Sequence, residues 1–183
     1  EWFAVDTMIY WESEIERIAH VAFQAAMKRR QHVTSIDKAN VLPSMAFFRR
    51  IFDEVAGAYP DVATDRVYID AMALFLVQQP DRYDVMVTEN IFGDILSDLA
   101  AGLVGGMGMA PSADIGAEHA VFQPSHGTAP TIAGQDIANP IATILSVALM
   151  LDWLDRPQTR AGARRIERAV NAVMSDNAFR TRD

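Results

Sequence analysis

The sequence contains no cysteine among its 183 residues. It therefore has no disulfide framework, thiolate metal site or cysteine nucleophile, and any metal must be held by oxygen or imidazole ligands. Positive charge is also scarce, because 16 lysines and arginines stand against 24 aspartates and glutamates, for a net charge of −8. We expect neither nucleic acid nor an anionic membrane as a partner, since both require a basic surface. A small molecule or a metal ion suits this composition better.

Long apolar runs and targeting signals are lacking as well. The most apolar run, IATILSVALML at 141–151, is shorter than the roughly 20 residues of a membrane-spanning helix and is followed by Asp152. We interpret it as a buried helix and expect a cytoplasmic protein. The opening, EWFAVDTMIYW, has neither a basic start nor a small-residue cleavage site, and its first residue is Glu1. We expect the sequence to be part of a longer chain.

The chain does contain a regular alternation of helical and extended segments, and half of its residues are hydrophobic, which suffices for a sizeable core. The periodicity predicts helices at 13–30, 42–58, 71–79 and 94–104, after Pro140 and near 160–175, and strands at 32–36, 66–69, 83–88 and 120–123. This is an α/β pattern, in which helices flank a largely parallel sheet. The glycine-rich stretch 105–116 resembles a junction between two packed bodies.

Three aspartates are candidate metal ligands. Asp94 and Asp98 in TENIFGDILSD stand four residues apart, which places them on one helix face with Cβ atoms about 5–6 Å apart. Asp70 follows the strand-like VYI, and the carboxyl ends of parallel strands gather ligands in open α/β sheets. Three carboxylates would suit Mg²⁺ or Mn²⁺. Spacing alone leaves open that Asp94 is a helix N-cap and Asp98 a solvated residue.

Three other residues are weaker candidates. Lys38 follows the strand-like HVTSI, where a solvated loop cation is the simpler interpretation. Tyr10, between Ile9 and Trp11, would ordinarily be an amphipathic packing residue. His126 lies in SHGTAP, whose backbone groups could bind a ligand or form a simple turn.

The run NIFGDILSDLAAGLVGGMGM resembles the signature segment of the isocitrate and isopropylmalate dehydrogenase family, the metal-dependent β-decarboxylating dehydrogenases. The likeness continues through VDTMIYWESEIERIA, SIDKANVL, YIDAM, HGTAPTIAGQDIANP and the ending FRTRD. It implies an isopropylmalate dehydrogenase-like α/β fold, as the C-terminal fragment of a two-domain subunit. Residues 1–105 would form the central dimerisation domain with the catalytic and metal residues, and 106–183 the C-terminal part of the nucleotide-binding domain.

The resemblance also implies roles for single residues. Tyr10 and Lys38 correspond to the catalytic residues, and Asp94 and Asp98 to the metal ligands. Asp70 corresponds to a third ligand and, like Lys38, would serve the active site of the neighbouring subunit, so a homodimer with shared sites is expected. The implied cofactor-binding residues are Asn40, Asn90, His126, Gly127, Thr128, Ala129, Thr131, Ile132 and Asn139.

The expected activity is NAD-dependent oxidative decarboxylation of a 2-hydroxy acid that bears a C3 carboxylate. The first choice of substrate is 3-isopropylmalate, in leucine biosynthesis, and tartrate, D-malate and isocitrate are the alternatives. Thr131-Ile132 matches neither the aspartate of NAD-preferring relatives nor the lysine-tyrosine pair of NADP-preferring ones. The absence of a cation there favours NAD over NADP.

Two other classes of function remain open. A non-catalytic regulatory or structural subunit could keep the fold and the dimer interface without turnover, and a divalent-metal hydrolase would use the aspartates without a cofactor. The family's arginine-rich substrate-binding segment precedes the region that this sequence resembles. We therefore do not expect this fragment alone to turn over.

Overall fold

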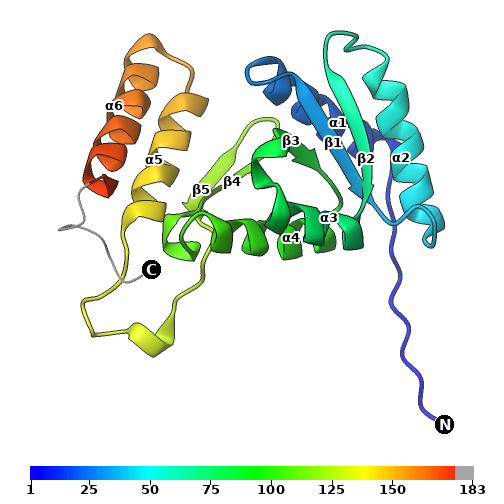
Figure 1. The fold of residues 1–183 in the computed structure, drawn as a ribbon, viewed down its shortest axis with the longest axis horizontal. Coiled ribbons are helices and arrows are strands. Elements are labelled where there is room, and N and C mark those ends of the chain that lie inside the picture. The colour runs from blue at the N-terminus through cyan, green and yellow to red at the C-terminus, as the bar shows by residue number, and fades with distance from the viewer. Residues whose placement is uncertain (176–183) are drawn as a thin grey trace. The chain divides into compact units, whose positions relative to one another are not determined.

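The computed structural model describes residues 1–175, so the ending FRTRD lies outside the described residues (Figure 1). The chain divides into two compact units, Glu1–Ser97 and a second unit that begins at Asp98. This division falls inside helix α4 (Asn90–Leu103), whereas the sequence predicted a boundary in the glycine-rich loop after residue 105. None of the helices within residues 1–175 has the length and apolar character that a membrane crossing requires.

The first unit contains a three-stranded parallel sheet with the order β2-β1-β3. The central strand β1 (His32–Asp37) pairs with β2 (Ala63–Tyr68) along its whole length and with β3 (Val85–Val87) on its other side. All residues of β1 after His32 are buried, as expected for a strand covered on both faces. The parallel α/β arrangement predicted from the sequence is therefore confirmed.

Three helices connect and cover this sheet. α1 (Glu12–Met27) and α2 (Pro43–Ala56) pack against each other and against β1, and α3 (Ile69–Gln78) links β2 to β3. The steps from β1 to β2 and from β2 to β3 run in opposite directions across the sheet, so right-handed crossovers place α2 and α3 on opposite faces. The core includes an aromatic stack in which the Phe23 ring lies 5.3 Å from Phe52 and 4.8 Å from Tyr59.

The predicted start and end of α1 are both corrected. Its N-cap is Trp11, without a side-chain hydrogen bond, so the helix begins at Glu12, one residue before the predicted start. The helix was predicted to end at residue 30, but its last residue is Met27, so Arg29 and Arg30 lie beyond it. Arg29 instead donates from Nε to Asp84 Oδ1 at 2.8 Å, and the Arg30 N–H donates to Asp84 Oδ2 at 2.9 Å. These two donors of Arg29 and Arg30 therefore bind the Asp84 carboxylate and not the carbonyl groups at the end of α1.

The second unit is an antiparallel hairpin covered by helices. β4 (Pro111–Ile115) pairs with β5 (Ala120–Pro124), and α5 (Ile141–Trp153) packs on both strands and on α6 (Pro157–Met174). The sequence pointed to β5 but missed β4, because PSADI contains a proline and an aspartate, which are uncommon in strands. Pairing with β5 overrides that local preference.

The apolar run that forms α5 was predicted to be a buried helix. The helix is confirmed, but its full burial is wrong. Ile141, Ala142 and Ala148 are buried, whereas Ile144 and Val147 are each 40% exposed. Within its own unit the helix is covered by a two-stranded sheet and by one neighbouring helix, which together enclose only part of its surface.

Candidate active site

The ends of two neighbouring strands bring Lys38 and Asp70 together. β1 ends at Asp37 and β2 at Tyr68, and these two residues are in register. Lys38 follows directly, and its Nζ lies 2.5 Å from Asp70 Oδ1. Asp70 was predicted to end the strand, but it lies in the first turn of α3. The hydrogen bond from Lys38 is the main cause that holds the pKa of the Asp70 carboxyl below its usual value.

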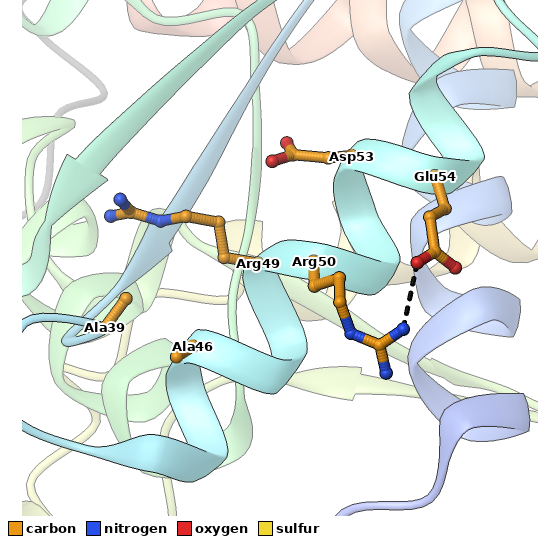
Figure 2. Close-up of a pocket in the computed structure, with 6 residues that line it drawn as sticks. All are labelled: Ala39, Ala46, Arg49, Arg50, Asp53 and Glu54. Atoms are coloured by element: carbon orange, nitrogen blue, oxygen red, sulfur yellow. Dashed lines mark hydrogen bonds and ion pairs between the residues drawn. The ribbon is translucent and has the colours of Figure 1, made fainter.

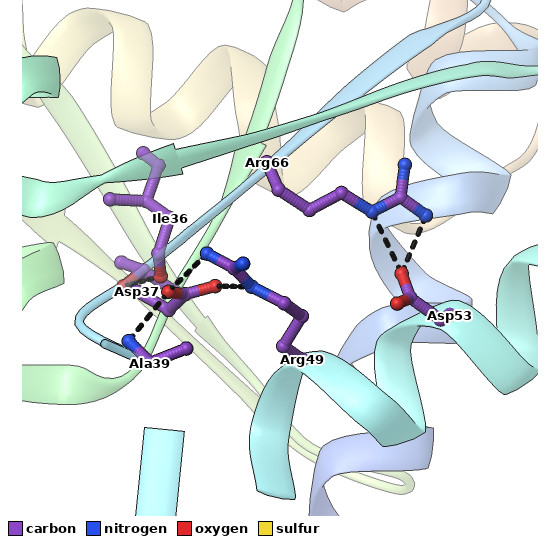
Figure 3. A network of polar contacts seen from close by, with 7 residues as sticks. Ile36, Asp37, Ala39, Arg49, Asp53 and Arg66 are labelled. Carbon is purple, nitrogen blue, oxygen red and sulfur yellow. Dashed lines mark hydrogen bonds and ion pairs between the residues drawn. The ribbon is translucent and has the colours of Figure 1, made fainter. Parts of the chain in front are cut away.

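A buried ion pair lies behind Lys38. Asp37 is fully buried and accepts two hydrogen bonds from the Arg49 guanidinium, each 2.8 Å long, and one of 2.9 Å from the Ala39 N–H (Figure 3). The Arg49 guanidinium also lies 5.1 Å from the centre of the Tyr68 ring. Arg49 thus connects the end of β1, the end of β2 and helix α2, and this fixes the backbone from which Lys38 extends.

A hollow of about 560 Å³ opens over α2 beside this pair. Its charged lining residues lie along one helix (Figure 2). Each of them has an ionic partner, since Arg50 pairs with Glu54 at 3.0 Å, Arg66 with Asp53 at 2.5 Å, and Arg49 with Asp37. These pairs stabilise the scaffold, and the hollow has no excess of positive charge with which to attract an anionic substrate.

Tyr10 contacts a buried carboxylate that the sequence analysis missed. Its phenol O–H donates to Glu89 Oε2 at 2.8 Å, and Glu89 is only 4% exposed. The pKa of Tyr10 is raised above its usual value. Burial is the largest cause, followed by the hydrogen bond to Glu89 and by the charge of Glu89. The detectable signal was an acidic residue placed between a strand and the next helix, in TEN at 88–90.

Glu89 also determines where α4 begins. Its carboxylate accepts the backbone N–H groups of Ile91 at 2.9 Å and Phe92 at 2.6 Å, which satisfies two donors of the first helical turn. The helix consequently starts at Asn90, one turn before the predicted start at Asp94. The alternative in which Asp94 serves as the N-cap is therefore wrong.

Asp94 and Asp98 lie one turn apart on α4, and both are exposed. Within residues 1–175, no group of three or more His, Cys, Asp or Glu side chains is arranged to hold a metal ion. The chain thus offers two carboxylates on one helix face, while its own Asp70 is bound to Lys38. This donor set fits a hard cation such as Mg²⁺ or Mn²⁺, provided that further oxygen ligands come from another molecule.

The second unit contains a pocket of about 440 Å³ next to the predicted cofactor loop. Six predicted cofactor-binding residues line it: His126, Gly127, Thr128, Ala129, Ile132 and Asn139. Thr131 is not among the lining residues, and its carbonyl accepts a 2.8 Å hydrogen bond from Gln135 Nε2. Asn40 and Asn90 lie in the first unit, where both are exposed.

The backbone of this loop is strained at two lining residues. Ala129 has φ 45° and Asp136 has φ 53°, left-handed values that are uncommon outside glycine. Local hydrogen bonds hold the loop, since the Ile141 N–H donates to Asn139 Oδ1 at 2.9 Å and His126 Nδ1 lies 2.8 Å from the Gly127 carbonyl. Strain that the surrounding structure maintains is common at ligand-binding sites.

The model of the family described as isocitrate/isopropylmalate dehydrogenase matches residues 1–183. The chain belongs to this family. A 3-isopropylmalate dehydrogenase of Albidiferax ferrireducens is 54% identical over 93% of this chain and 48% of its own length. That of Moorella thermoacetica is 49% identical over 98% of this chain and 50% of its own. The chain therefore spans about half the length of the curated relatives that it matches.

Solved structures support the same family and fold. An isocitrate dehydrogenase from Methylococcus capsulatus has a TM-score of 0.88 and 45% identity, covering 93% of this chain and 50% of that one. A β-decarboxylating dehydrogenase from Thermococcus kodakarensis has a TM-score of 0.75 and 46% identity, covering 82% of this chain and 45% of that one. The isocitrate/isopropylmalate dehydrogenase-like fold and the predicted family are thus confirmed.

Proposed function

We propose that the protein carrying this chain is an NAD-dependent dehydrogenase that oxidises and decarboxylates 3-isopropylmalate, in leucine biosynthesis. The observation that carries the proposal is the 2.5 Å contact between Lys38 and Asp70 at the ends of adjacent parallel strands. Ligands of open α/β sheets bind at this edge, so the contact brings a lysine and a carboxylate to the place where a substrate is expected. The names of relatives about 50% identical support 3-isopropylmalate as the substrate.

Lys38 is the proposed base that accepts the proton of the substrate hydroxyl group, directly or through a water molecule. Only the neutral amine can accept a proton, so Lys38 must leave its ion pair with Asp70 and release its own proton to solvent before this step. After CO₂ has left, Tyr10 donates its phenol proton to the carbon that carried the carboxylate. The phenol is held 2.8 Å from Glu89, and its raised pKa keeps it protonated until then.

The pocket beside Ala129 is the proposed binding site of the adenosine part of NAD. The nicotinamide part of bound NAD would accept the hydride from the substrate. Its lining contains Asp136 and neither lysine nor arginine. The 2′-phosphate of NADP would lack a cation there, which supports NAD as the cofactor. Roles for Asn40, Asn90 and Thr131 in cofactor binding stay predictions, and so does the cytoplasmic location.

Asp94 and Asp98 are the proposed ligands of Mg²⁺ or Mn²⁺, with Asp70 supplied by a second copy of the chain. When bound, the metal would stabilise negative charge on the substrate oxygen atoms. Both aspartates are exposed, which leaves room for a metal and a substrate beside them.

A homodimer with shared active sites follows from this ligand set. Apolar side chains on two helices of the first unit support it, since Leu74 and Val77 on α3 and Ile91 and Ile95 on α4 are 53–58% exposed. On α2, the large apolar residues Phe48, Ile51 and Phe52 are buried in the core of the unit, so they add no exposed apolar surface.

Metal binding can be tested by thermal unfolding of the full-length protein. Mn²⁺ should raise its melting temperature through binding linkage, and Asp94→Asn should remove most of that rise. Asp152→Asn, an exposed helical aspartate outside the proposed site, is the matched control and should keep the full rise. An unchanged response in Asp94→Asn would exclude Asp94 as a ligand.

The substrate and the class of function can be tested by steady-state kinetics of the full-length protein. We expect NAD reduction with 3-isopropylmalate at a higher kcat/KM than with isocitrate, D-malate or tartrate. If NAD is reduced fastest with another of these acids, that acid is the substrate and the proposed reaction class still holds. No reduction with any of them would favour the non-catalytic subunit, and metal-dependent hydrolysis without reduction would favour the hydrolase.

A further inference from the structure

Glu89 is a buried carboxylate whose three hydrogen-bond partners all act as donors. They are the Tyr10 phenol and the N–H groups of Ile91 and Phe92. An ionised carboxylate accepts hydrogen bonds and donates none, so this environment suits the anion. The buried negative charge is compensated by the first turn of α4, where the helix dipole is positive, and by the phenol.

This carboxylate also determines the position of the segment before α1. Residues 1–9 are exposed and have no regular secondary structure, whereas Tyr10 is partly buried and packs against the core of the first unit. The hydrogen bond to Glu89 spans 79 positions of the chain and is the polar contact of the Tyr10 side chain. Glu89 therefore joins Tyr10 to the start of the helix that carries Asp94 and Asp98.

We propose that Glu89 is a positioning residue for Tyr10, which orients the phenol as a proton donor relative to α4. The inference rests on the proposed function, in which Tyr10 protonates the decarboxylated carbon. In that step the phenol O–H bond breaks, a C–H bond forms, and the phenolate later recovers a proton from solvent. Because the phenol has a single proton, which is directed at Glu89 in the structure, the hydrogen bond must open as the substrate carbon becomes negatively charged.

A purely structural role is the competing interpretation, because Glu89 also caps α4. The cap acts through the backbone N–H groups of Ile91 and Phe92, and the positioning role acts through the phenol oxygen. Removing the phenol hydroxyl therefore separates the two roles. Loss of the cap should lower kcat whether or not residue 10 carries a hydroxyl group. Loss of positioning should lower kcat only when residue 10 carries one.

The test is a double-mutant cycle in the full-length protein with Glu89→Gln, Tyr10→Phe and both together. We expect Tyr10→Phe to lower kcat about 100-fold and Glu89→Gln about tenfold, within the range typical of general acid catalysis. The double variant should be no slower than Tyr10→Phe. An equal tenfold loss in both backgrounds would overturn the positioning role. An unchanged kcat in Tyr10→Phe would instead show that the proposed function of Tyr10 is wrong.

Two further measurements do not depend on turnover. In ¹³C-tyrosine NMR spectra, Glu89→Gln should lower the pKa of the Tyr10 phenol without restoring its usual value, because burial is the larger cause of its shift. Tyr10→Phe assigns the signal. The Mn²⁺-dependent rise in melting temperature should be the same in Glu89→Gln as in the wild type, since α4 keeps its aspartates. An unmoved phenol titration, or a lost metal response, would overturn the proposal.

Discussion

At the scale of single residues, a buried ion pair determines the geometry around Lys38. Asp37 has no exposure to solvent, and its charge is balanced by the bidentate contact with Arg49. The hydrogen bond to Asp37 is the main cause that raises the pKa of Arg49 above its usual value, and burial opposes that rise. A buried carboxylate that loses its only cationic partner is strongly destabilising.

Arg49→Met should therefore lower the free energy of unfolding by about 3–5 kcal/mol. The neighbouring Arg50 provides the matched control. It belongs to the same helix, but its pair with Glu54 is more than half exposed on both sides, so Arg50→Met should cost only about 0.5 kcal/mol. Urea denaturation of the two full-length variants measures both values. Equal effects would mean that the Asp37 charge is compensated by a group other than Arg49.

At the scale of elements, the loop after β5 contains two non-glycine residues with left-handed backbone, Ala129 and Asp136. Ala129 has left-handed backbone at the point where the loop enters the short 3-10 helix Pro130–Ile132, and it lines the proposed NAD pocket. For an L-residue this conformation costs about 1–2 kcal/mol. Glycine avoids that cost but has a larger entropy loss on folding, of roughly 0.5–1 kcal/mol.

Ala129→Gly should thus change the free energy of unfolding by less than about 1 kcal/mol, while Ala129→Val should destabilise by at least 1 kcal/mol, because a β-branched residue is poorly tolerated at positive φ. Ala133 in the same loop has φ −59°, so Ala133→Gly should only destabilise, by about 0.5–1 kcal/mol. Urea denaturation measures all three values. A larger loss in Ala129→Gly than in Ala133→Gly would contradict left-handed backbone at residue 129.

At the scale of the whole molecule, the proposed ligand set requires two copies of the chain. Lys38 and Asp70 are paired with each other, and the two aspartates of α4 are insufficient for a closed metal site in the described part of one chain. A monomer should therefore be inactive. The exposed apolar residues of α3 and α4 are the surface through which we expect two copies to associate.

Mixing full-length Lys38→Met with full-length Asp94→Asn tests this architecture. In a heterodimer of the two variants both lesions fall in one shared site, and the other site is intact. Each parent should be nearly inactive, and random subunit exchange should restore up to about a quarter of wild-type activity, since half of the dimers have one good site of two. Exchange is checked by mass spectrometry. Confirmed exchange without recovered activity would show that Lys38 and Asp94 serve the same chain's site.

Much of the fold could be predicted from sequence because helices and strands have local periodic patterns. The segment HVTSI indicated β1, and helical periodicity indicated α1 and α5. Boundaries were less predictable, because they depend on which side chain satisfies the free N–H groups of a helix end. Because Glu89 caps α4, the helix starts one turn before the predicted start. No local pattern distinguished Glu89 from Asp94 as the capping residue.

Motifs and short-range periodicity were sufficient to identify the family, the α/β class and the residue types at the proposed site, because these features depend on neighbouring residues. Three features are seen only in the folded protein: Tyr10 donates to Glu89, Asp37 pairs with Arg49, and α5 is partly exposed. The physical reason is that hydrogen bonds, ion pairs and burial form between residues far apart in the chain. Which residues contact each other depends on their distance in the folded chain, and a pattern in the sequence does not contain that distance.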